Sequence, residues 1–208
     1  LRYPGGSGDP DAEAVTIAGS LSDGIFVGAE RNNSAGSVSR NSILRFDAAA
    51  AGTTLSATHE WNLTGELPNT PSNEGIEAIT WVPDSYLVAT GFVDAETGAA
   101  YNPANYPNHG TGLFFVGLEA TGGVYAFALD LTGSGYTRVA TISTGFEGVM
   151  DLHFDRERNR LWAVCDDNCD GRSRVLAVGG SGAFVNADDA AVAAIAPLAE
   201  SVVTYGLA

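Results

Sequence analysis

Residues 73–82 read NEGIEAITWV, and two other stretches of the chain echo this pattern. Residues 11–18 read DAEAVTIA, and residues 145–154 read GFEGVMDLHF. In each copy we expect an apolar strand just after an acidic residue, then a polar turn and a second strand that ends in an acid. The copies recur at a period of roughly 65–75 residues, and such self-similarity indicates a repeat architecture.

Short β-rich runs fill the chain between these copies. Examples are GIFVGAE (24–30), SYLVATGF (85–92) and GLFFVGLE (112–119), and turn residues such as glycine, aspartate and asparagine separate the runs. The alanine-rich tail after residue 186 is the one stretch with helical character. We therefore predict an all-β chain.

Four antiparallel strands per repeat around an axis would form a β-propeller. A β-sandwich also has many short strands, but it does not require internal repetition. We expect a single unit over residues 1–208, with repeats at about 9–66, 73–144 and 145–186 and the start of a fourth at 187–208. Because typical propellers have about four to eight blades, the chain would be a small propeller or part of a larger ring.

The net charge of the chain limits the classes of partner that it can bind. Lysine and arginine number 10 against 25 acidic residues, which gives a formal net charge of −15. Such a surface repels nucleic-acid backbones and anionic lipid, whereas it attracts cations or simply keeps the protein in solution. No apolar run approaches the roughly 20 residues that cross a membrane as a helix, so we expect no membrane span.

Several stretches resemble secreted bacterial propellers of the group called esterase-like activity of phytase, and the related SdiA-regulated propellers. The similarity covers most of residues 3–178, and its most distinctive stretches are YPGGSGDPDAEAVTI (3–17), NEGIEAITW (73–81), GLFFVGLEATGGVYAFAL (112–129) and GFEGVMDLHFDRERNRLWAVCDD (145–167). The resemblance implies a secreted protein that hydrolyses phosphate or carboxylic esters, often with calcium.

Residues 165–171 read CDDNCDG and contain the only two cysteines, Cys165 and Cys169. Their C-x3-C spacing differs from the C-x2-C of zinc ribbons and thioredoxin-type sites. In an exported protein this pair predicts a local disulfide at the end of a hairpin. Buried free thiols and a metal thiolate are the alternatives.

The same stretch also has the first half of a calcium loop. Asp166, Asn168 and Asp170 offer oxygen ligands at positions 1, 3 and 5, and a glycine follows. Position 12 is Ala177, so the bidentate glutamate of an EF-hand is missing. The stretch is therefore either a short calcium loop or a turn with solvated carboxylates.

Other acids predict a second metal site, because the first strand of each propeller blade lines the central channel. The repeat openings would place Glu13, Glu74 or Glu77, and Glu147 or Asp151 near one end of that channel, and the second-strand ends would add Glu30, Asp94 and Asp166. Like charges at close range raise each other's pKa, so such a ring requires cations, and calcium fits it. Alternatively, the repeat-opening glutamates hydrogen-bond backbone N–H groups between blades.

Two classes of function follow. The first is a calcium-dependent ester hydrolase in which Glu77 or Asp151 acts as the base, while His109, Arg31 and Arg40 contact the anionic substrate. The second is a non-catalytic extracellular module for binding, adhesion or assembly. No G-x-S-x-G serine elbow is present.

Overall fold

The computed structural model describes residues 1–187, and in it the chain folds into three four-stranded antiparallel sheets that follow one another along the sequence. The first sheet contains β1–β4 (Pro10–Ile17, Ile25–Asn32, Ser39–Phe46, His59–Asn62). The second contains β5 and β8–β10 (Ile76–Pro83, Gly112–Leu118, Gly123–Leu129, Tyr136–Ser143). The third contains β11–β14 (Asp151–Asp155, Arg160–Val164, Ser173–Val178, Phe184–Asn186). The prediction of an all-β chain with antiparallel sheets is confirmed.

Short elements occupy the connections. The 3-10 turns η1 (Leu21–Asp23), η2 (Asn33–Ala35) and η4 (Asp167–Cys169) lie in hairpin loops. The long connection from β5 to β8 holds α1 (Asp84–Thr90), the ribbon β6–β7 (Val93–Asp94, Ala99–Ala100) and η3 (Pro103–Asn105). Within residues 1–187, no helix is long and apolar enough to cross a membrane.

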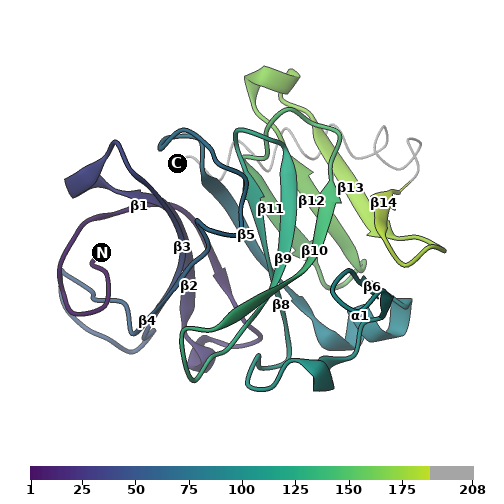
Figure 1. Ribbon diagram of the computed structural model, residues 1–208, viewed down its shortest axis with the longest axis horizontal. Coiled ribbons are helices and arrows are strands. Elements are labelled where there is room, and N and C mark those ends of the chain that lie inside the picture. Colours follow the sequence, from purple (N-terminus) through teal and green to yellow (C-terminus); the bar gives the residue numbers. More distant parts are fainter. Residues whose placement is uncertain (188–208) are drawn as a thin grey trace.

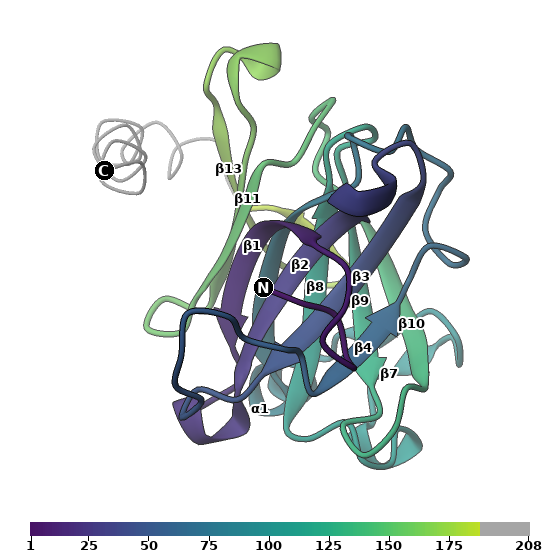
Figure 2. The ribbon, with the colours of Figure 1, turned by 90° about the vertical axis from the view of Figure 1, so that its left-hand side faces the viewer.

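The three sheets stand side by side in chain order, as Figure 1 shows from purple to yellow-green. Their first strands are neighbours, because β1 contacts β5 and β5 contacts β11. Figure 2 shows the first sheet in front, with β1 at one of its edges. Over the part of the chain that the structure describes, the sheets do not close into a ring.

Most of the core lies in two layers between the sheets. Phe26 and Trp61 of the first sheet pack against Phe114 of the second, and the Phe26 and Phe114 ring centroids are 4.4 Å apart. Leu113 and Phe115 point to the other face of the second sheet, where they join buried residues of the third. The second sheet is thus covered on both faces, which explains why every residue of β8 is buried.

Two glycines set equivalent contacts between consecutive sheets. A Cβ added to Gly28 in β2 would lie 2.8 Å from Ile76 Cγ2 at the start of β5. A Cβ added to Gly117 in β8 would lie 2.9 Å from Val149 Cβ, just before β11. The second strand of each of these sheets therefore approaches the first strand of the next sheet at a glycine, in the same way at both interfaces.

One predicted strand is wrong. Residues 85–92 were expected to form a strand, but Asp84–Thr90 is the helix α1. The helix follows Pro83, and its C-cap is Gly91, which has a left-handed backbone conformation with φ 66°. A short apolar run has no periodicity that separates a strand from a helix. The second strand of this sheet is consequently β8, and Asp94 lies in the insertion instead of at a second-strand end. The expected fourth repeat from residue 187 lies outside the described residues, apart from its first residue.

Candidate metal centre

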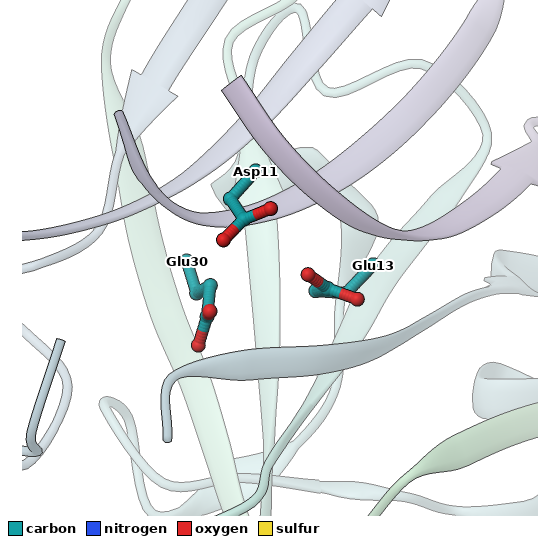
Figure 3. Close-up of side chains that lie close together, drawn as sticks. All are labelled: Asp11, Glu13 and Glu30. Atoms are coloured by element: carbon teal, nitrogen blue, oxygen red, sulfur yellow. The ribbon is translucent and has the colours of Figure 1, made fainter. Parts of the chain in front are cut away.

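Five carboxylates from the first two sheets meet in one cluster. Asp11, Glu13 and Glu30 offer oxygens within 4.8 Å of one another, and so do Glu30, Glu77 and Glu119. Because Glu30 belongs to both groups, the five form a single set, which we call the carboxylate cluster. Figure 3 shows three of its members close together, on the neighbouring strands β1 and β2.

Two of these glutamates occupy β-bulges on the first strands of their sheets. Ala12 pairs with Ala29 and Ala14 with Gly28, so Glu13 is an extra residue in β1. In the same way, the β5 residues on either side of Glu77 pair with consecutive residues of β8. A bulge redirects a side chain locally, and bulges are frequent next to functional sites. The sequence echo between DAEAVTIA and GIEAITWV therefore corresponds to a repeated bulged glutamate.

Two further glutamates come from the second strands. Glu30 follows the stretch VGA near the end of β2, and Glu119 follows VGL directly after β8. Each of the first two sheets therefore supplies one first-strand and one second-strand glutamate. The ladder between β11 and β12 in the third sheet has no bulge, and the third sheet adds no member to the cluster.

Burial and mutual repulsion make the cluster electrostatically unfavourable when it is ionised. Burial, together with the charges of Glu13, Glu30 and Glu119, raises the pKa of Glu77 to about 8. Burial is also the main reason why the pKa values of Glu13, Glu30 and Glu119 lie above their ordinary value. A bound cation would reduce the repulsion between these five partly buried carboxylates.

Arg31 neutralises part of the negative charge of the cluster. Its Nη2 lies 2.6 Å from Asp11 Oδ2, and its Nη1 lies 3.6 Å from Glu30 Oε1. Within residues 1–187, no other basic side chain forms an ion pair with the cluster. One guanidinium against five carboxylates leaves the cluster with an excess of negative charge.

Glu30 also joins the first two sheets. Its Oε2 accepts a hydrogen bond from the backbone N–H of Gly75 at 3.1 Å, just before β5. The neighbouring Asn41 Oδ1 accepts one from the N–H of Ile76 at 2.9 Å. The alternative role foreseen for the repeat-opening glutamates, a hydrogen bond to backbone N–H groups between sheets, is thus performed here by a second-strand glutamate.

The stretch CDDNCDG is a cross-linked turn. Cys165 and Cys169 form the predicted disulfide, with Cα atoms 5.7 Å apart. The carboxylate of Asp166 caps η4, because it accepts the N–H of Asn168 at 3.0 Å. Within the described range, neither Asp166 nor Asp170 belongs to a group of three potential metal ligands. A calcium ion in this turn stays a prediction.

The residues predicted as catalytic do not come together in one place. Glu77 belongs to the cluster and Arg31 pairs with it, but Asp151 is exposed and outside it. His109 is buried, and its Nε2 lies 3.1 Å from Asp84 Oδ2. Asp84 follows the far end of β5, about 23 Å from Glu77 at the usual rise of an extended strand. His109 therefore holds the long insertion in place, away from the cluster.

Two other predicted residues also have separate roles. Glu147, proposed as a metal ligand, is exposed and lies outside the cluster. Arg40, proposed to meet an anion, forms two hydrogen bonds to the carboxylate of Glu60 at 2.8 and 2.7 Å. Sequence reasoning missed the cluster members Asp11 and Glu119, although the echo between VGAE and VGLE pointed to Glu119.

No protein-family model and no curated protein matches the chain in sequence.

Proposed function

We propose that this protein is an extracellular, calcium-binding protein of the β-propeller type, with the carboxylate cluster as its metal centre. The three sheets would be consecutive blades. Support comes from their first strands, which are neighbours, and from the equivalent close approaches at Gly28 and Gly117. The excess of five carboxylates over one guanidinium is the observation that carries the proposal of a metal centre.

Calcium suits the donor set better than the other common metals of proteins. Calcium takes about six to eight oxygen ligands in a flexible geometry, and carboxylates are its usual partners. Zinc prefers histidine nitrogen or cysteine sulfur, and the cluster contains neither in the part of the chain that the structure describes. The two bulges and the two strand ends bring four glutamates together from four backbone segments, and Asp11 adds a fifth carboxylate, so the cluster offers the several oxygen ligands that calcium takes.

For the reaction, we propose hydrolysis of phosphate or carboxylic esters, as the sequence resemblance suggests. Calcium, when bound, would stabilise negative charge on an ester oxygen and lower the pKa of a coordinated water. Glu77 is the candidate base, because its half-buried carboxyl belongs to the cluster and would lie close to a water on the bound ion. Arg31 would orient Asp11 and Glu30, since both of its contacts with the cluster are ion pairs.

A second candidate is a non-catalytic module for extracellular binding, adhesion or assembly that calcium stabilises. Arg31 and Arg40 are both engaged with carboxylates, and His109 is buried beside Asp84. Consequently, none of the three basic residues expected to bind a substrate anion is available beside the cluster. This observation favours a structural ion over a catalytic one.

Calorimetric titration of calcium into chelator-treated protein tests the metal centre. We expect saturable binding that weakens at least tenfold in Glu77→Gln, because the cluster loses one negative charge, and that is unchanged in the exposed control Glu66→Gln. The Asp166→Asn variant tests whether calcium binds at the CDDNCDG turn instead of at the cluster. Absence of calcium binding in the unmodified protein would refute the metal centre.

Hydrolysis is tested separately with p-nitrophenyl phosphate and p-nitrophenyl acetate. Turnover of either ester that requires calcium and is lost in Glu77→Gln, at calcium concentrations that saturate the variant, supports the hydrolase. Calcium binding without turnover of either ester assigns the protein to the non-catalytic class.

A further inference from the structure

A second potential site lies at the opposite end of β5 from the carboxylate cluster. A cavity of about 610 Å³ opens between the end of β5, α1, the turn from β11 to β12 and the end of β13. Pockets that bind small organic molecules have volumes of roughly 300–1,000 Å³. The cavity is therefore large enough for such a ligand, and the function proposed above does not use it.

The charge of this cavity is opposite to that of the protein as a whole. The chain has an excess of 15 negative charges, yet Arg156 and Arg160 line the cavity. Among the described residues that form its wall, none is aspartate or glutamate. Since like-signed charges around a concave surface reinforce one another, the cavity attracts anions.

The two arginines keep hydrogen-bond donors available. The guanidinium of Arg156 lies over the ring of Trp81 at 4.8 Å, and within residues 1–187 it has no ion pair. Arg160 directs Nη1 to the carbonyl oxygens of Arg158 and Asn159, so its other nitrogens remain for a ligand. By contrast, Arg158 in the same turn pairs with Asp155 at 2.9 Å.

The rest of the wall combines the polar residues Ser85, Thr90 and Asn159 with a well-packed aromatic part. Tyr86 and Phe154 are both buried, and their ring centroids lie 4.9 Å apart. The Tyr86 hydroxyl accepts a hydrogen bond from the N–H of Val178 at 3.3 Å, which holds its ring in place. Arg160 lines the same cavity as Tyr86 and Phe154, so the cation and the aromatic wall face the same space.

We propose that this cavity binds a small organic anion with an apolar body. Its acidic group, a carboxylate or a group of similar charge, would accept hydrogen bonds from Arg156 and Arg160. Its apolar part would pack against Tyr86 and Phe154. A pocket with an apolar wall and a few convergent polar groups is the usual form of a small-molecule site.

Titration calorimetry with 2-naphthoate tests the proposal, with 2-naphthalenemethanol as its neutral analogue. We expect saturable binding of one 2-naphthoate and at least tenfold weaker binding of the neutral analogue. Arg156→Ala and Arg160→Ala should each weaken 2-naphthoate about tenfold, because each removes charge-assisted hydrogen bonds. Arg158→Ala is the matched control and should bind as the unmodified protein does.

A variant that fills the cavity, Ala89→Trp, should abolish binding and leave calcium binding unchanged. All three arginines are exposed, so equal melting temperatures will show that the variants fold. Failure of both 2-naphthoate and phenylphosphonate to bind overturns the proposal. So does equal binding of the neutral analogue, or an equal loss in Arg158→Ala.

Discussion

Replacing Glu77 by glutamine should stabilise the protein when no divalent cation is present. The folded state raises the pKa of this carboxyl from 4.5 to about 8, chiefly by burial and then by its acidic neighbours. A shift of that size corresponds to about 5 kcal/mol at 1.36 kcal/mol for each pKa unit. Because the side chain is only half-buried, solvent screening reduces our expectation to about 2–4 kcal/mol.

The sign of the pH dependence follows from the direction of the shift. A raised folded-state pKa means that ionisation of Glu77 opposes folding. The penalty is absent below about pH 4.5, grows as the pH rises toward 8, and is complete above that value. Glutamine removes the penalty, so the gain of the variant should appear over the same range of pH.

Thermal unfolding in the presence of a chelator measures this effect. At about 3 °C for each kcal/mol in a chain of this size, Glu77→Gln should melt about 6–12 °C above the unmodified protein near pH 9. Near pH 4 the two should melt together. Saturating calcium should reverse the order near neutral pH, because the ion stabilises the unmodified protein by binding. A variant that gains nothing at high pH in chelator would refute the electrostatic reasoning.

Three further predictions concern packing, titration and cross-linking. Gly117→Ala should lower the free energy of unfolding in urea by about 1–3 kcal/mol, because the added Cβ would overlap the next sheet. Gly65→Ala is the control and should be neutral, because the space around Gly65 is open. Equal effects of the two substitutions would contradict the close approach. His109→Gln should destabilise the protein more near pH 5.5 than near pH 8.5, because the hydrogen bond to Asp84 raises the pKa of the histidine. The stability that this hydrogen bond provides is complete below about pH 6.5 and is lost as the pH rises through the folded-state pKa. A loss of melting temperature that does not depend on pH would contradict this prediction. Replacing Cys165 and Cys169 by alanine should lower the unfolding free energy by about 2 kcal/mol, as expected for a very short closed loop, and a loss above about 4 kcal/mol would show a larger role.

Much of the fold could be predicted from local sequence patterns. Short β-rich runs separated by turn residues predicted antiparallel sheets, because a hairpin needs such turns between its strands. The insertion after Pro83 was harder. Residues 85–92 are apolar enough for a strand, but Pro83 and Gly91 frame one short helix, and only the packing of Tyr86 and Leu87 decides between the two structures.

The site was predicted in part for a related reason. Glu13 and Glu77 could be recognised because they repeat at the same place in two copies, and Glu30 because it ends a strand. Glu119 was missed, since an incorrect second strand put Asp94 in its place. His109 was expected to contact the substrate, but it contacts Asp84 instead, and this contact depends on how the insertion folds back on itself. No local pattern reports such a long-range contact.

The division of the cluster between the first two sheets has a mechanical consequence. Like charges face one another across the seam where these sheets meet, while the Gly75 N–H and Glu30 hold that seam together. When the carboxylates are ionised and no cation is present, this seam is the place where the fold should open first. The connection 63–75 would then become the preferred point of proteolytic cleavage, and a cation bound at the cluster would protect it.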